Sequence, residues 1–534
     1  MDLREKDSPV RPNRPFGHVR PPTAEQLQEY SARHHFDLDE ELAAQLVPVV
    51  AEMVTAFDLI DELPQPAQPP TPYTDRDIGR EPTGDEDPFN AFIRFCRVEG
   101  AAEGPLRGLT AAIKDCIAVG GMPTTNGSRM LPTVIATEDA VVVERLLAAG
   151  ATIVGKTNLE DMAMGIGEGS VYGPALNPNN PAHGTGGSSS GSGAAVAAGM
   201  VDFALGVDEA GSIRIPAAWC GLVGMKATHG LVPSYGLTYM DHTLDHIGPI
   251  TRGVELNARV LEVLAGADWR DPQWVRDLPE PESYGSAVGE GVSGLRFAVV
   301  EESLEPNGAT PDVIAAFNEG LAALESAGAI VERVSVPLWT AAWPIQSGVM
   351  AFNARAMADS AGVGYFHKGR ADVNAAVTTA AQRRTTYKDL AILSRLMLVL
   401  AEHMRDEYLG IHYAKAQNLR LELGKQIDAA LQGRAALLTP TTPTVATELV
   451  QGRQGVLSMI PRMTGNAILN TCPLDLTGHP ALTVPAGPGE KGLPVGLQVI
   501  GRHFDESTLY RTGAVIEAAG LWKLAAEPSA PVLR

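Results

Sequence analysis

The sequence predicts an α/β protein with a large mixed sheet covered by helices on both faces, preceded by an N-terminal helical extension. Two copies of a helix, glycine and apolar strand unit, around Gly150 and Gly328, predict the sheet. Such units are typical of parallel or mixed sheets that pack helices on their faces. An apolar stripe at helical spacing, followed by a proline-rich linker, predicts the extension.

The extension comprises residues 1–74. Residues 1 to about 22 are rich in proline and charge, so we expect a poorly ordered arm there. From Leu38 onward the apolar residues recur every three or four positions and predict an amphipathic helix that ends before the linker at 64–72: Leu42, Leu46, Val49, Met53, Phe57 and Ile60. An apolar stripe must be covered. We expect the helix to cap the main body, and the alternative is a homodimer formed through the N-terminal helices.

The main domain comprises residues 75–534. In its first unit Thr137 is the expected N-cap of a helix that ends at Gly150, and a strand follows at 151–154. In its second unit a helix at 321–327 ends at Gly328, and a strand follows at 329–334. Beyond residue 75 no further linker is strong enough to divide the body.

Composition excludes several classes of function. The chain has 42 basic and 63 acidic residues and a net charge of −21, which repels polyphosphate backbones and anionic lipids. We therefore expect no nucleic-acid partner. The four cysteines, Cys96, Cys116, Cys220 and Cys472, have no CxxC spacing, which argues against a zinc ribbon or a disulfide framework and fits a reducing cytoplasm.

The sequence also argues against a membrane segment. Residues 1–20 have no apolar core of the kind found in secretory signals. The long apolar stretches at 194–207 and 391–400 are interrupted by Asp202 and Arg395 and are too short to span a bilayer. We expect a cytoplasmic protein.

Two glycine runs that carry serines indicate the chemistry. Ser188 lies in the run 186–193 and Ser212 lies in 211–216, 24 positions apart, with Lys114 upstream. Small residues allow backbone N–H groups and hydroxyls to crowd one point, as the stabilisation of an oxyanion requires. These features predict a serine hydrolase whose base is a lysine. The first run leads directly into Ala194, which favours a structured loop at a helix N-terminus over a flexible linker.

Other motifs fit poorly in context. Residues 150–157 match a P-loop literally, but their apolar, β-favouring centre predicts a strand, which argues against nucleotide binding. Ser189 satisfies G-x-S-x-G, but the preceding residues 177–185 contain two prolines and cannot form the buried strand of a nucleophile elbow.

The histidines are weaker candidates. His242 and His246 have the i, i+4 spacing of a zinc pair, but they lack the intervening glutamate and an evident third ligand. We expect structural or rim roles for His183, His229 and His479, which lie in glycine- or proline-rich loops.

Seven segments, in the right order from about residue 75 to the end, closely resemble the amidase signature family. They are 113–115, 155–165, 186–199, 208–226, 244–249, 478–485 and 492–498. The resemblance implies the amidase-signature fold and a catalytic triad of Ser212, Ser188 on a cis peptide bond, and Lys114.

The chemistry of the residues agrees with that triad. An amide is a poor leaving group, so the enzyme must activate a hydroxyl and protonate the departing nitrogen. A free lysine has a pKa of about 10.4, and burial can lower it by up to roughly 3 to 5 units. Lys114 could then take a proton from Ser188, which takes one from Ser212, the nucleophile. The alternative for Lys114 is a buried ion pair with Asp115 or another acid.

The resemblance also implies an oxyanion hole formed by the backbone N–H groups of Glu209, Ala210, Gly211 and Ser212. Ala210 replaces a glycine that is usual in the family, so a positive φ there would strain the loop. Ser190 also stands where the family commonly has glycine, and Glu209 adds a potential negative charge. Arg214 and Asp245 match family positions and are expected to support the loops.

We therefore expect an amidase that converts a small carboxylic amide and water to an acid and ammonia or an amine, without a metal or an organic cofactor. The alternatives are a carbamate, ester or urea-type substrate, or an amidotransferase A-subunit that needs protein partners. The N-terminal extension and residues 208–212 resemble those of the stand-alone bacterial amidases that accompany nitrile hydratases, whereas the amidotransferase relatives generally lack such an extension.

Overall fold

The computed structural model describes residues 19–66, 71–167, 169–273, 275, 277–450, 467–524 and 533. The chain divides into two compact units, Met1–Pro70 and Thr71–Arg534. The first unit contains α1 (Ala24–Arg33) and α2 (Glu40–Glu62), each begun by a side chain that accepts a backbone N–H, Thr23 and Asp39. The first 18 residues, most of the expected arm, lie outside the described residues.

Helix α2 confirms the predicted amphipathic helix. Among the helices in the described part of the chain, α2 alone is long and apolar enough to cross a membrane, by length and composition only, with a mean hydropathy of 1.6. The periodicity of the apolar stripe does not reveal this mean hydropathy. The homodimer through this helix and the cytoplasmic location stay predictions.

A twelve-stranded mixed sheet forms the centre of the second unit, in the order β1-β2-β4-β3-β5-β7-β6-β11-β12-β10-β8-β9. This confirms the predicted fold class. The strands are β1 (Arg76–Arg80), β2 (Phe92–Val98), β3 (Thr110–Lys114), β4 (Thr152–Thr157), β5 (Phe203–Asp208), β6 (Val223–Lys226), β7 (His246–Thr251), β8 (Arg296–Val300), β9 (Ile330–Val334), β10 (Ala436–Pro440), β11 (Ala481–Pro488) and β12 (Pro494–Ile500).

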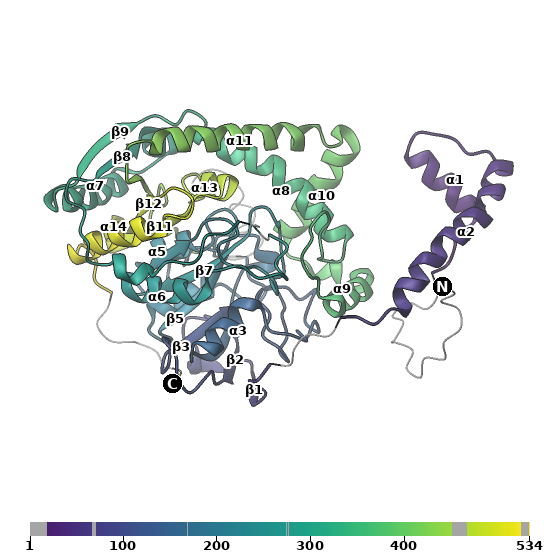
Figure 1. The fold of residues 1–534 in the computed structure, drawn as a ribbon, viewed down its shortest axis with the longest axis horizontal. Helices are drawn as coiled ribbons and strands as arrows, with labels where there is room; N and C mark the ends of the chain where they lie inside the picture. The colour runs from purple at the N-terminus through teal and green to yellow at the C-terminus, as the bar shows by residue number, and fades with distance from the viewer. Residues whose placement is uncertain are drawn as a thin grey trace. The chain divides into compact units, whose positions relative to one another are not determined.

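Helices cover the sheet, as Figure 1 shows. They are α3 (Val141–Ala148), α4 (Ser190–Ala197), α5 (Arg214–Cys220), α6 (Val254–Leu264), α7 (Pro311–Ser326), α8 (Ala342–Asp359), α9 (Val373–Thr386), α10 (Ile392–Tyr408), α11 (Ile411–Leu431), α13 (Cys472–Thr477) and α14 (Glu506–Ala518). Helices α10 and α11 both pack against α8.

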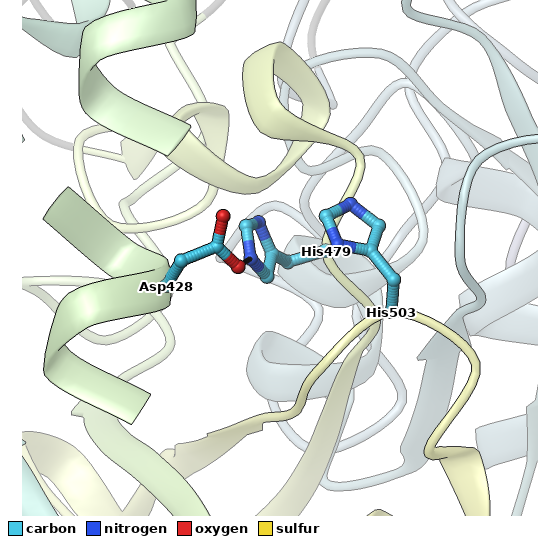
Figure 2. A group of neighbouring side chains, drawn as sticks. All are labelled: Asp428, His479 and His503. Atoms are coloured by element: carbon cyan, nitrogen blue, oxygen red, sulfur yellow. Dashed lines mark hydrogen bonds and ion pairs between the residues drawn. The ribbon is translucent and has the colours of Figure 1, made fainter. Parts of the chain in front are cut away.

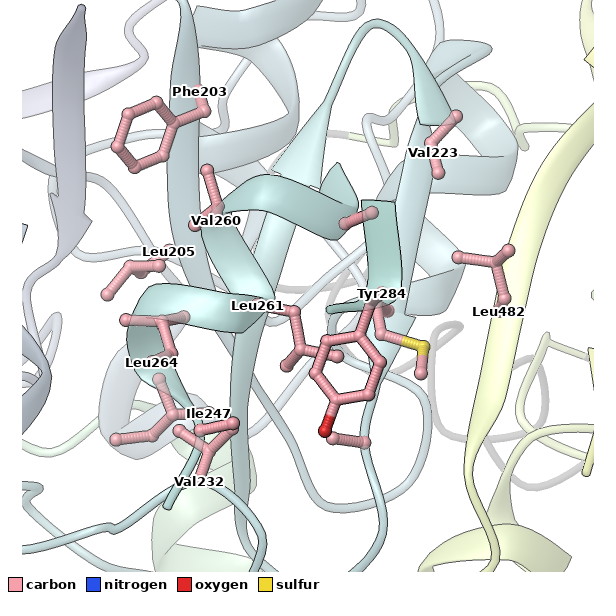
Figure 3. Close-up of a cluster of buried hydrophobic side chains, with 14 of the residues drawn as sticks. Phe203, Leu205, Val223, Val232, Ile247, Val260, Leu261, Leu264, Tyr284 and Leu482 are labelled. Carbon is pink, nitrogen blue, oxygen red and sulfur yellow. The ribbon is translucent and has the colours of Figure 1, made fainter. Parts of the chain in front are cut away.

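Strand β5 shows how the two faces are filled. Phe203 and Leu205 point to one face, where they join the large core that includes Leu261 of α6, and Figure 3 shows this cluster. Ala204, between them, joins a second core that consists largely of alanines from α4 and neighbouring segments. Side chains alternate along a strand, so the larger residues fill one face while small residues let α4 approach the other closely.

The two predicted units are present, and the starts of both helices are corrected. Helix α3 begins at Val141 with Ala140 as its N-cap, so Thr137 is not the cap. The Asp139 carboxylate instead accepts a hydrogen bond from the Gly120 N–H at 2.7 Å and pairs with Arg76, which holds this segment outside the helix. Helix α7 begins ten residues before the expected start and ends before Gly328, whose φ is +88°.

Candidate active site

Lys114 is the last residue of the buried strand β3, which lies between β4 and β5. The side chain is fully buried, and its Nζ lies 2.8 Å from the Ser188 Oγ and 3.3 Å from the carbonyl oxygen of Val207 on β5. Burial lowers the pKa of Lys114 below its ordinary 10.5, although nearby acids, including Glu160 and Asp245, oppose the shift. A buried lysine thus contacts a serine hydroxyl rather than a carboxylate.

The Ser188 loop is built around small residues. The Gly187–Ser188 peptide bond is cis, as the family resemblance implies. A Cβ on Gly187 would lie 2.7 Å from the backbone nitrogen of Gly167, so no side chain fits there. Ser189, the next residue, exchanges hydrogen bonds with the backbone of Val207, which occupies its hydroxyl structurally.

Ser212 lies half-buried in the connection between β5 and α5. Asp208 fixes this loop, because its carboxylate accepts the backbone N–H groups of Gly211 at 2.5 Å and Ile213 at 3.0 Å. The loops of Ser188 and Ser212 both approach Gly206 on β5. A Cβ on Gly206 would lie 3.0 Å from the Oγ of Ser189, next to Ser188, and 3.0 Å from the Cγ1 of Ile213, next to Ser212.

Arg214 supports the loop, in agreement with its expected role. Its guanidinium donates to both carboxylate oxygens of Asp208, at 3.0 and 2.9 Å, and to Asp475 at 2.7 Å. It also donates to the Thr471 carbonyl and the Gln498 side chain. All five residues are buried, so this network joins β5 and α5 to α13 and β12.

This arrangement reduces the number of backbone N–H groups that could stabilise the oxyanion. Gly211 donates its N–H to Asp208, which leaves the N–H groups of Glu209, Ala210 and Ser212 as candidate donors. The positive φ, +130°, belongs to Gly211, where a Cβ would lie 2.3 Å from Thr471 Oγ1. Ala210 has no positive φ, so the strain considered for it is absent.

The acids beside the site are buried. Burial and the neighbouring Asp245 raise the pKa of Glu209 well above its ordinary value. Burial also raises the pKa of Asp245 to about 7, and the carboxylate accepts backbone N–H groups from Met240 and Asp241. The raised pKa of Glu209 disfavours its charged form, which would oppose an oxyanion.

The alternative role for Lys114, an ion pair with Asp115, is wrong. Asp115 pairs instead with Lys156 on β4, at 2.7 Å, and both side chains are buried. Sheet register explains this choice. Lys156 lies opposite Ile113 and thus faces the same side as Asp115, whereas Lys114 points to the opposite side.

The structure also decides the other motifs. Residues 152–157 of the literal P-loop form β4. The weakly supported zinc pair, His242 and His246, forms other contacts: His242 bonds with the Val363 carbonyl and His246 with the Leu244 carbonyl.

Three buried residues of this region, Lys156, Asp208 and Asp475, are not assigned a role by the sequence alone. The first two lie in segments 155–165 and 208–226, so the family resemblance already marked them. Asp475 lies outside every matching segment, and its contact with Arg214 spans 261 residues, which no local pattern reveals.

Comparisons with known proteins agree with this geometry. The Amidase family model matches residues 95–510. The A-subunit of glutamyl-tRNA(Gln) amidotransferase from Natronomonas pharaonis is 39% identical over 439 residues, 80% of this chain and 99% of that protein. The peptide amidase structure from Stenotrophomonas maltophilia is 30% identical and covers 78% of this chain and 83% of its own, with a TM-score of 0.63.

A third comparison corrects the expectation that the amidotransferase relatives lack the N-terminal extension. The structure of the glutamyl-tRNA(Gln) amidotransferase A-subunit from Thermotoga maritima is 30% identical and covers 96% of this chain and 98% of its own, with a TM-score of 0.66. A match of that extent reaches into Met1–Pro70, so these helices do not separate the chain from such relatives. The expected closeness to nitrile-hydratase-associated amidases stays a prediction. The chain therefore belongs to the amidase family.

Proposed function

We propose that this chain hydrolyses the C–N bond of a small apolar carboxylic amide through an acyl-enzyme intermediate. The observation that carries the proposal is the 2.8 Å contact between the buried Lys114 Nζ and the Ser188 Oγ. Burial favours the neutral amine. A neutral amine in contact with a hydroxyl can act as its base.

The reaction begins when the Ser188 hydroxyl gives its proton to Lys114 and takes the proton of Ser212. The Ser212 oxygen attacks the amide carbonyl, and the N–H groups of Glu209, Ala210 and Ser212 are the candidates to stabilise the oxyanion. The relay then returns the proton to the departing nitrogen. Water, activated through the same relay, releases the acid and restores Ser212.

An apolar cavity supports the substrate class. It has a volume of about 180 Å³, and its wall includes Met130, Leu131, Val134, Met162, Met164 and Leu390. The segment that carries Met162 and Met164 continues to Gly167, whose backbone nitrogen would lie 2.7 Å from a Cβ on Gly187. We assign this cavity to the acyl group, because its wall is mainly apolar and stabilises alkyl or aryl groups, although it also includes Glu138, Arg370 and Asp372.

An amidotransferase A-subunit is the second candidate, and the sequence identity to such proteins favours it. In that case the amide would be supplied by glutamine, and transfer would need partner proteins. The same triad chemistry would release ammonia from either substrate. A carbamate, ester or urea-type substrate could also use this triad.

Ammonia release by the purified full chain separates these functions. We expect turnover of hexanamide and benzamide without any partner, little turnover of glutamine, and no turnover by the Ser212→Ala variant. Hydrolysis of glutamine alone would favour the amidotransferase function. Preferential hydrolysis of a matched carbamate or ester would assign the triad to that substrate class. No hydrolysis of any of these substrates would contradict a stand-alone hydrolase.

A further inference from the structure

Three side chains with metal-ligating atoms meet at one end of the sheet, outside the candidate active site. Asp428 comes from α11, His479 lies between α13 and β11, and His503 follows β12. One ligand atom from each lies within 4.8 Å of the others. Figure 2 shows the His479 ring between the carboxylate of Asp428 and the ring of His503.

Strand pairing explains this convergence. The antiparallel pairing of β11 and β12 aligns Ala481 with Ile500. His479, just before β11, and His503, just after β12, therefore lie at the same end of this strand pair. Helix α11 lies close to α13 and brings Asp428 to this end.

Thr477 fixes the hydrogen positions on both rings. Its hydroxyl donates its single hydrogen to the Pro473 carbonyl at 2.9 Å, so it must accept from the Nδ1–H of His479, also at 2.9 Å. Its carbonyl can only accept, so it receives the Nε2–H of His503 at 3.1 Å. In the neutral rings, the Nε2 of His479 and the Nδ1 of His503 therefore carry lone pairs.

The lone pair on His479 then meets another acceptor. Its Nε2 lies 3.2 Å from Asp428 Oδ1. Two acceptors at this distance need a proton or a cation between them.

We propose that Asp428, His479 and His503 bind a divalent transition-metal ion of the Zn²⁺ type. Two imidazoles and one carboxylate form a ligand set that suits Zn²⁺, whereas Ca²⁺ and Mg²⁺ prefer oxygen ligands alone. Thr477 supplies the outer hydrogen bonds that typically orient metal-binding histidines. Water completes the coordination shell.

The ion would link α11 to the ends of β11 and β12. Asp428 and His503 are exposed while His479 is buried, and His503 also lines a surface cleft of about 830 Å³, so an ion can enter from solvent. The three ligands are brought together only by the folded chain. Binding therefore raises the thermal transition temperature as well as giving a titration signal.

The test is a Zn²⁺ titration of the untagged full chain after chelator treatment, followed by calorimetry, with the visible spectrum of bound Co²⁺ as a second readout. We expect one equivalent of Zn²⁺ to bind and to raise the transition temperature. Asp428→Asn and His503→Ala, both at exposed positions, should each weaken binding by at least about tenfold. Thr477→Val should weaken Zn²⁺ binding by about 10–100-fold, whereas Thr477→Ser, which keeps the hydroxyl, should bind Zn²⁺ as tightly as the wild type.

The matched control is His412→Ala, which removes an exposed histidine from α11, the helix that carries Asp428. Its affinity for Zn²⁺ should equal that of the wild type. The proposal is overturned if the wild type shows no saturable Zn²⁺ binding. Equal affinity in the wild type and in the Asp428→Asn/His503→Ala double variant would also overturn it.

Discussion

Two buried lysines occupy neighbouring parallel strands and have opposite surroundings. Lys156 on β4 pairs with Asp115 at 2.7 Å, whereas Lys114 on β3 contacts the Ser188 hydroxyl and a backbone carbonyl. Both side chains are fully buried. The contact partner distinguishes them, because a carboxylate at contact distance stabilises an ammonium and a hydroxyl leaves the neutral amine accessible.

The difference also assigns a face of the sheet to each task. Lys156 and Asp115 lie on the side of the large core, where a paired charge is neutralised within the fold. Lys114 points toward the second core, where alanines and glycines of the α4 region let the Ser188 loop approach. Small residues on one face of the sheet thus make room for the chemistry.

Ser212→Ala gives the largest expected effect, because it removes the proposed nucleophile, which lies on the sheet face that Lys114 points to. We expect amide turnover to fall by about 10⁴- to 10⁶-fold with an unchanged circular dichroism spectrum. Ser189→Ala is the matched control, since the Ser189 hydroxyl bonds to Val207, and it should keep most of the activity. Comparable losses in both variants would contradict the assignment of Ser212.

Lys114→Met and Lys156→Met test the comparison itself. Lys114→Met should lower kcat by about 10²- to 10⁴-fold, because it removes a general base. Lys156→Met should instead lower the free energy of unfolding by about 3–5 kcal/mol, because it leaves the buried Asp115 without its counter-charge. Kinetics and urea denaturation on both variants measure the two effects. An activity loss in Lys156→Met alone would reverse the two roles.

The pH dependence of kcat/KM follows from the lowered pKa of Lys114. The base works only when unprotonated, so activity should rise with pH through the pKa of Lys114, and this rise should lie below pH 10.5. Rates measured from about pH 5 to about pH 11, with the fold checked at each pH, give the profile. A rate that rises only above the ordinary lysine pKa would show that Lys114 stays charged.

Asp245→Asn should have the smallest effect. Asp245 raises the pKa of Lys114 through its negative charge. Removing that charge lowers the pKa of Lys114, so the rise in kcat/KM should move to lower pH by a fraction of a unit. Asp271→Asn, a buried carboxylate that bonds Ser234, serves as the control and should leave the profile in place. A shift to higher pH in Asp245→Asn would contradict the proposed electrostatics.

The sequence predicts the parts of the fold that depend on local pattern. Glycines such as Gly328, with φ at +88°, follow the ends of helices because they adopt a positive φ without strain, and they can be read from the sequence. The start of α3 could not be predicted in the same way, because the contacts of Asp139 with Gly120 and Arg76 come from other segments. Strand order is likewise set by pairing over long separations.

In the candidate site, too, some residues can be predicted from local pattern and others depend on long-range contacts. Lys114, Ser188 and Ser212 are marked by residue type, spacing and family resemblance. Asp475 is not, because it joins Arg214 across 261 residues. The cluster of Asp428, His479 and His503 also depends on the register of β11 with β12, which no local pattern specifies.

The central claim, that Lys114 is uncharged when the enzyme works, is tested most directly by titrating its side chain by NMR. Lysine can be labelled at Cε and Nζ, and the Lys114→Met variant assigns the Lys114 signal by its disappearance. We predict a titration well below pH 10.5 that coincides with the rise in kcat/KM. A Lys114 signal that remains that of a charged ammonium throughout the pH range of activity would contradict the account.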